Sequence, residues 1–169
     1  MKTKFIQLVV VLFFFFGAFS CKEAINEVKE IEATPVQVTL SSSKDLVSAA
    51  KKEIKQISPD QLEAKMQSGE YYIIDVREKE EYVKGNIPGS ILIPRGFLEF
   101  KIGKEEFWED KTLKMPTHDQ KIILYCKSGG RGSLSTKSLQ EMGYTNIVNL
   151  DGGYLNWVST YPSEAPEEN

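Results

Sequence analysis

The chain has 169 residues, of which 41% are hydrophobic and 27% are charged, and its formal net charge is −3 at pH 7. This length fits one domain of ordinary size with additional segments. The charge gives no basis for nucleic-acid binding, which needs a clustered basic face. Two cysteines, Cys21 and Cys126, and one histidine, His118, are too few for a Cys/His zinc site or a disulfide framework, so we expect no metal and no cofactor.

The first 20 residues have the pattern of a targeting segment. Lys2 and Lys4 give a positive start, and residues 8–16 are uninterrupted apolar sequence. This run is shorter than the ~20 residues that span a bilayer, which favours a cleaved signal peptide. The stretch resembles a bacterial lipoprotein signal, cleaved before a cysteine that receives lipid, although Phe19 stands where that pattern has a smaller residue.

We therefore predict a signal peptide over residues 1–20, membrane attachment through a lipidated Cys21, and a location in the cell envelope. Periplasmic and surface exposure both stay open, as do plain secretion and an uncleaved helix. Residues 21–44 are poor in large apolar side chains and lack periodicity, which predicts a flexible tether.

Order is expected from residue 45. Apolar residues at helical spacing predict an amphipathic helix over 45–55, and Ile57 opens a short strand. Ser58, Pro59 and Gln61 then have the pattern of a helix start with a capping box, and Gly69 ends that helix.

The middle of the chain alternates between apolar runs and turns. We predict strands over 71–76 and 91–94, a short acidic helix over 78–83 between them, and a partly helical connection over 95–113. Residues 115–119 then form a loop.

The last part of the chain also alternates between predicted strands and helices. A buried strand over 121–125 ends on Cys126, and a helix follows over 133–142. A strand over 147–150, a turn and a helix carrying Tyr154 and Trp157 complete the domain, and an acidic tail over 163–169 is predicted to be disordered.

Strands that alternate with helices predict an α/β domain over residues 45–162, with an open, mostly parallel twisted sheet and helices on both faces. Ligands of such sheets bind beyond the carboxyl ends of the strands. The residues at these ends are Asp75, Arg77, Pro94, Arg95 and Cys126. Asp75 and Arg77 are expected to tie strand ends together as an ion pair, and Arg95 is a further candidate for the rim of a pocket.

The junction after residue 125 is the strongest functional signal. Cys126 is followed by Lys127, Ser128, Gly129, Gly130, Arg131 and Gly132, and then by a helix. A loop at a helix N-terminus gathers backbone N–H groups and the positive end of the helix dipole. Such a site favours a thiolate and an anionic substrate together.

Three stretches resemble the rhodanese, or sulfurtransferase, domain. They are residues 75–94, which include Asp75-Val76-Arg77-Glu78 and Ile87-Pro88-Gly89-Ser90, residues 125–131, and residues 142–157 with Leu150-Asp151-Gly152-Gly153. Asn86 stands where the family commonly has histidine, and its amide can make the same kind of turn hydrogen bond. The resemblance implies a single α/β domain in which Cys126 carries a sulfur atom as a persulfide.

On this hypothesis Cys126 takes sulfur from thiosulfate or a similar donor and passes it to cyanide, a small thiol or a protein thiol, in a ping-pong reaction. The loop amides, the helix dipole and Lys127 or Arg131 would activate the thiol, because His118 lies in the loop before the strand and does not suit a Cys–His pair. Arg131 would bind the oxyanion end of the donor in a bidentate contact, and Gly129, Gly130 and Gly132 would let the loop curl.

Other functions remain open. Cysteine-dependent phosphatases have five residues between cysteine and arginine, whereas here there are four, which makes phosphatase or arsenate-reductase chemistry a weaker hypothesis. A persulfide relay that serves a partner protein, or a non-catalytic binding or regulatory module of the same fold, are the stronger alternatives. Cys126 could also be a buried structural cysteine.

Overall fold

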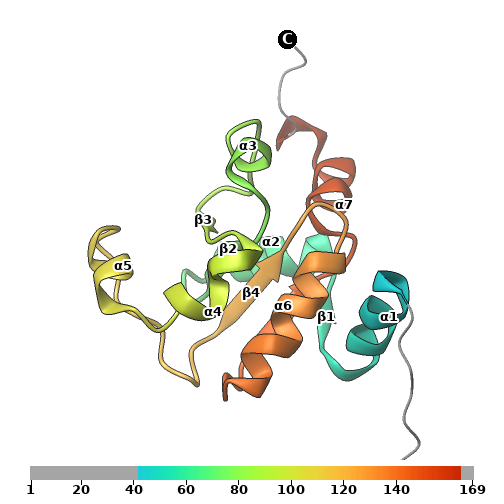
Figure 1. Cartoon of the computed structure of the whole chain (residues 1–169). Coiled ribbons are helices and arrows are strands. Elements are labelled where there is room, and N and C mark those ends of the chain that lie inside the picture. The colour runs from blue at the N-terminus through green and yellow to red at the C-terminus, as the bar shows by residue number, and fades with distance from the viewer. Residues whose placement is uncertain (1–41, 165–169) are drawn as a thin grey trace, which may run out of the picture. The chain divides into compact units, whose positions relative to one another are not determined.

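The computed structural model describes residues 42–164 (Figure 1). The predicted signal peptide over residues 1–20, the predicted lipidation site Cys21 and the predicted tether up to residue 41 lie outside this range, as do residues 165–169 of the predicted tail. Within the described range, no helix is long and apolar enough to cross a membrane.

One five-stranded parallel sheet forms the centre of the described domain. Its strands are β1 (Gln56–Ile57), β2 (Tyr72–Asp75), β3 (Ile91–Leu92), β4 (Ile122–Tyr125) and β5 (Ile147–Leu150), in the order β1-β5-β4-β2-β3. The predicted open parallel sheet is confirmed. Because all strands run the same way, the carboxyl ends of β2, β4 and β5 meet at one edge, and Cys126 follows β4 at that edge.

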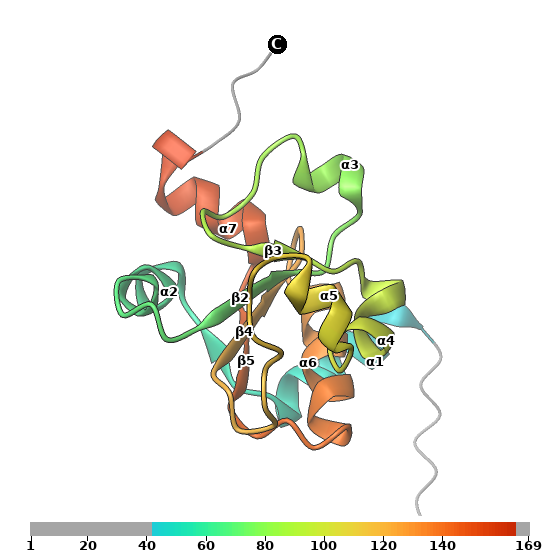
Figure 2. The same cartoon turned by 90° about the vertical axis from the view of Figure 1, so that its left-hand side faces the viewer.

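Helices cover both faces of the sheet, as predicted (Figure 2). One face carries α1 (Ser43–Glu53), α4 (Leu98–Lys101), α5 (Glu105–Glu109) and α6 (Gly130–Glu141), and the other carries α2 (Pro59–Met66) and α7 (Gly153–Thr160). The short α3 (Lys79–Tyr82) follows β2, and single 3₁₀ turns span Arg95–Phe97 and Pro162–Glu164.

The core is divided between these two faces. All four residues of β4 are buried, and they alternate between the two apolar clusters: Ile122 and Leu124 pack with Leu139 of α6, whereas Ile123 and Tyr125 pack with Trp157 of α7. A strand buried on both sides needs a continuous apolar run, which explains the sequence of β4.

Several helix boundaries follow from capping groups. Ser58 accepts a hydrogen bond from the Gln61 amide at 3.2 Å, and Gln61 returns one to the Ser58 amide at 3.0 Å, so the predicted capping box is confirmed. The first helix begins at Ser43 rather than at residue 45, because the Ser42 hydroxyl caps it by accepting from the Asp45 amide. The last 3₁₀ turn includes residues 163 and 164, where the disordered tail was expected to begin.

The start of α6 is the main correction. The sequence predicted a helix from Ser133, since glycines have low helix propensity. The helix begins at Gly130 instead, because Gly129 adopts a left-handed conformation (φ 90°) as its N-cap and its carbonyl accepts the Ser133 amide at 2.9 Å. The N-terminus of α6 therefore lies closer to Cys126 than predicted.

Candidate active site

The loop after β4 holds the one free thiol of the described residues. Cys126 follows Tyr125 at the end of β4 and is 1% exposed. Only residues 127–129 separate it from the first turn of α6, and of these Lys127 and Ser128 are exposed while Gly129 is buried. A nucleophile in this place is shielded from bulk water.

The amides of this loop are available to an anion. Among residues 42–164, no protein oxygen accepts a hydrogen bond from the backbone N–H groups of residues 127–132. Gly129 and Gly132 are buried, where unpaired N–H groups are rare. The last of these amides belong to the first turn of α6, at the positive end of its dipole. The loop therefore provides donors for a thiolate, a persulfide or a bound oxyanion.

A second turn, at the start of α7, fixes the other side of the loop. The Tyr154 amide donates to the Cys126 carbonyl at 2.7 Å, and the Leu155 amide donates to the Lys127 carbonyl at 3.0 Å. Gly153 has φ 60°, and a Cβ atom there would lie 2.3 Å from the Cys126 carbonyl oxygen. Only glycine permits this approach of α7 to the loop.

Gly132 is required for packing rather than for a loop conformation. It lies in α6, and a Cβ atom at this position would lie 2.2 Å from Oδ1 of the buried Asn149. The Asn149 side-chain amide donates in turn to Gln56 at 3.3 Å. The glycine thus lets α6, and the loop before it, lie directly against β5.

Arg131 is paired with a carboxylate. Its Nη1 donates to Oε2 of Glu81 at 2.6 Å, and its Nη2 donates to Oε1 at 2.8 Å. Hydrogen bonding to Arg131 lowers the pKa of Glu81 to about 2. The same hydrogen bonds raise the pKa of Arg131, and the nearby Cys126 adds to this rise. Both side chains are about one-third exposed.

This pair changes how Arg131 can act. The sequence predicted a guanidinium whose two terminal nitrogens face the donor, whereas both of them donate to Glu81. Binding of an oxyanion by Arg131 stays a prediction, and it now requires that Glu81 shares or gives up the guanidinium.

Asp75 and Arg77 form the expected structural ion pair. Asp75 is fully buried and Arg77 is 3% exposed, and Nη2 of Arg77 lies 2.7 Å from Oδ2 of Asp75. Arg77 also donates to the Gly85 carbonyl at 2.7 Å and lies over the ring of Tyr154. Burial alone would lower the pKa of Arg77, but the hydrogen bond and charge of Asp75 raise it overall.

Tyr125 supports the loop from behind. Its hydroxyl accepts from the Ile87 amide at 3.1 Å and shares a hydrogen bond of 2.9 Å with the Ser90 hydroxyl. Burial raises the pKa of Tyr125, so the hydroxyl stays neutral. Asn86 donates to the Tyr82 carbonyl at 3.3 Å, which is the turn hydrogen bond expected of its amide.

Other candidates lie apart from the thiol. Arg95 pairs with Glu99, which also accepts from Ser138 at 2.6 Å, and Arg95 lines neither of the two cavities that reach the loop. His118 stacks on Tyr144 with ring centroids 4.8 Å apart. In residues 42–164 no three His, Cys, Asp or Glu side chains form a cluster that could hold a metal ion.

Two cavities flank the loop. One has a volume of about 570 Å³ and lies between α1, the loop residue Ser128 and Gly130 at the start of α6. The other has a volume of about 280 Å³ and is lined by Lys127 of the loop, by residues of the β2–α3 region and by α7. The loop can therefore be approached from two sides.

The sequence located the thiol and the loop but not their supports. Glu81, Gly153 and the hydroxyl of Tyr125 were not assigned to the site, although each belongs to a stretch that carries the family resemblance. A Gly-Gly pair beside a helix start was the available signal for Gly153. The partner of Arg131 had no local signal, because Glu81 lies 50 residues earlier.

Known proteins are similar in sequence to this chain. The sequence model of the rhodanese-like domain family matches residues 58–160 of this chain. Thiosulfate sulfurtransferase 18 of Arabidopsis thaliana is 34% identical over 134 residues, which cover 72% of this chain and 93% of that protein. The thiosulfate:glutathione sulfurtransferase of Homo sapiens is 31% identical over 105 residues, which cover 60% of this chain and 91% of that protein.

The fold agrees as well. The solved structure of a human single-domain sulfurtransferase matches with a TM-score of 0.58 and 30% identity, and it covers 62% of this chain and 95% of its own. A parallel α/β sheet, a buried thiol at the end of its central strand and a matching family model over most of the described residues lead to one assignment. The chain belongs to the rhodanese-like sulfurtransferase family.

Proposed function

We propose that the chain is a thiosulfate sulfurtransferase-like enzyme that works through a persulfide on Cys126. The observation that carries this proposal is the buried free thiol at the start of a loop whose backbone N–H groups donate to no protein oxygen. Such a site can stabilise the thiolate and the terminal sulfur of a persulfide, which are both anions.

In the first half-reaction the Cys126 thiolate attacks the outer sulfur of thiosulfate. A new S–S bond to Cys126 forms, the S–S bond of thiosulfate breaks, and sulfite leaves with the electron pair. The loop amides and the N-terminus of α6 would hold the negative charges, and Lys127 and Ser128 would meet the sulfonate oxygens.

In the second half-reaction an acceptor removes the outer sulfur. A thiolate or cyanide attacks that sulfur, the bond to Cys126 breaks, and the Cys126 thiolate is restored. The name of the similar human protein contains glutathione, which supports a thiol as acceptor. The reaction needs no oxidant, because the sulfane sulfur passes from sulfite to the Cys126 thiolate and then to the acceptor with no net loss of electrons.

The test is the intact mass of the chain from residue 22 onward, before and after thiosulfate, with Cys126→Ser in parallel. We expect a gain of one sulfur atom that cyanide or dithiothreitol removes and that the variant lacks, because the serine hydroxyl cannot form a persulfide. No adduct from thiosulfate, 3-mercaptopyruvate or polysulfide would contradict an enzymatic function and favour a binding module.

We also propose attachment to the cell envelope through a lipid on Cys21. The support is the sequence pattern before Cys21 alone: two lysines, an apolar run and small residues. Expression of the full chain in a bacterium, followed by mass analysis of the mature N-terminus, tests it. A mature chain that begins at any other residue would contradict it.

A further inference from the structure

The helix α1 lies outside the residues that the family model matches. The family model begins at residue 58, whereas α1 spans Ser43–Glu53. It nevertheless packs beside the thiol loop: a Cβ atom on Gly130 would lie 3.6 Å from a methyl group of Val47, and Ala50 is 1% exposed. The helix therefore forms one wall of a groove whose other wall is the loop itself.

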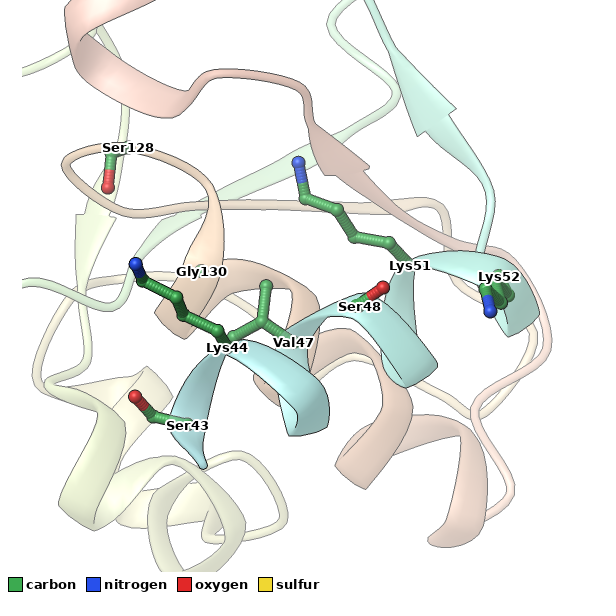
Figure 3. Close-up of a pocket in the computed structure, with 8 residues that line it drawn as sticks. All are labelled: Ser43, Lys44, Val47, Ser48, Lys51, Lys52, Ser128 and Gly130. Carbon is green, nitrogen blue, oxygen red and sulfur yellow. The ribbon is translucent and has the colours of Figure 1, made fainter. Parts of the chain in front are cut away.

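This α1 groove has a volume of about 570 Å³ and is lined by α1, by Ser128 of the loop and by Gly130 at the start of α6 (Figure 3). Its lining residues are Ser43, Lys44, Val47, Ser48, Lys51, Lys52, Ser128 and Gly130. Every ionisable residue in this set is a lysine. Figure 3 shows the side chain of Lys44 extending towards the loop.

The cavity on the opposite side of the loop has a different charge pattern. Its lining includes Glu80 and Glu81 together with Arg77, Lys84 and Lys127. Carboxylates there oppose the approach of an anion, whereas no carboxylate lines the α1 groove. Of the two approaches to the loop, the groove is therefore the one suited to an acidic partner.

The lysines are spread out rather than gathered around one point. Lys44 and Lys52 are eight positions apart, which is ~12 Å along a helix at about 1.5 Å per residue. That distance matches roughly four residues of extended chain at about 3.3 Å each. Nζ of Lys51 lies 3.1 Å from Oδ1 of Asp151 and forms an ion pair with it. Of the three groove lysines, Lys44 and Lys52 are therefore the two whose charge is not paired within residues 42–164. A small anion such as thiosulfate would meet only one of them.

We propose that the α1 groove binds an acidic peptide segment that carries the acceptor thiol. This inference rests on the proposed persulfide function and names the class of its acceptor. The acceptor thiolate attacks the outer sulfur of the Cys126 persulfide, the bond between the two sulfurs of that persulfide breaks, and the Cys126 thiolate leaves, so the acceptor becomes a persulfide and no electrons are lost.

The experiment measures persulfide discharge in single turnover. The full chain is loaded with sulfur, loading is verified by mass, and two synthetic peptides with one cysteine are compared: one with Asp and Glu around the cysteine, the other with Asn and Gln. We expect the acidic peptide to react about tenfold faster at low ionic strength, because opposite charges speed the encounter. The advantage should decrease as salt is added.

The double variant Lys44→Glu/Lys52→Glu should remove this preference for the acidic peptide. Lys104→Glu/Lys114→Glu is the matched control, since it makes the same change in charge at exposed positions outside the groove, and it should keep the preference. Equal rates for the two peptides, or a preference that survives in the groove variant, would overturn the inference.

A binding measurement separates this inference from the proposed function. Acidic peptide with serine in place of its cysteine is titrated into the full chain, and it should bind more weakly to the groove variant than to the control. If Cys126 takes no sulfur, the proposed function fails while this result still decides whether the groove binds acidic peptides. Vesicles with anionic lipid form a second arm, and groove-dependent binding to vesicles without binding to peptide would overturn the proposal in favour of a membrane surface.

Discussion

Two arginine–carboxylate pairs lie near the thiol, and they differ in burial. The Asp75–Arg77 pair is 0% and 3% exposed, whereas the Glu81–Arg131 pair is about one-third exposed on both sides. In the buried pair the charges are removed from water and each depends on the other. In the exposed pair water can replace either partner at small cost. The first is therefore a structural element, and the second is the one that can exchange its partner for a substrate.

The largest effect is expected from breaking the buried pair. Asp75→Asn would leave the guanidinium of Arg77 without its counter-charge and should lower the free energy of unfolding by about 3–5 kcal/mol. Chemical denaturation monitored by tryptophan fluorescence measures this. Glu81→Gln, which breaks the exposed pair in the same way, is the matched control and should cost less than about 1 kcal/mol. Similar losses in the two variants would show that burial does not distinguish the pairs.

An effect on activity of intermediate size is expected at Arg131. Arg131→Lys keeps a positive charge but loses the bidentate geometry, so the rate of persulfide formation with thiosulfate at low donor concentration should fall about tenfold, as for one charge-assisted hydrogen bond of about 1.5 kcal/mol. Glu81→Gln should act in the opposite direction and lower the KM for thiosulfate, because it releases the guanidinium of Arg131. A higher KM in Glu81→Gln would instead mean that Glu81 positions Arg131 for binding.

The smallest effect is the pH dependence of the exposed pair. Arg131 lowers the pKa of Glu81 from its ordinary value of 4.5 to about 2, so the ionised carboxylate stabilises the folded state above pH 4.5. This contribution should be lost as the pH falls from 4.5 towards 2, and partial exposure keeps it below about 1 kcal/mol. Urea denaturation of the wild type and Glu81→Gln across this range should show their difference in stability shrinking. A constant difference would contradict a pKa-linked contribution.

Much of the fold could be predicted from local pattern. The continuous apolar run before Cys126 predicted a buried strand, and the Ser58–Gln61 capping box predicted a helix start, because both signals depend on residues that are neighbours in sequence. The ion pair of Asp75 and Arg77 could be anticipated for the same reason, since only one residue separates them.

Other features could not be predicted from residues that are neighbours in the sequence. Gly130 and Gly132 are poor helix formers, yet they lie in α6, which begins after the left-handed N-cap Gly129. Asn149 on β5 leaves no room for a side chain at residue 132. The role of Gly153 depends on the contact between α7 and the Cys126 carbonyl, which no local pattern predicts. In both cases the constraint comes from an element that is distant in sequence.

The sequence by itself determined the class of fold, the position of the thiol at a strand end and the loop that follows it, since periodicity, caps and turn residues act over a few positions. Only the tertiary structure decided that Arg131 is paired with Glu81, that α7 supports the loop through Gly153, and that α1 adds a lysine-lined wall beside it. These contacts join segments that lie about 20 to 90 residues apart, and no local pattern specifies which distant surfaces meet when the two faces of the sheet are covered.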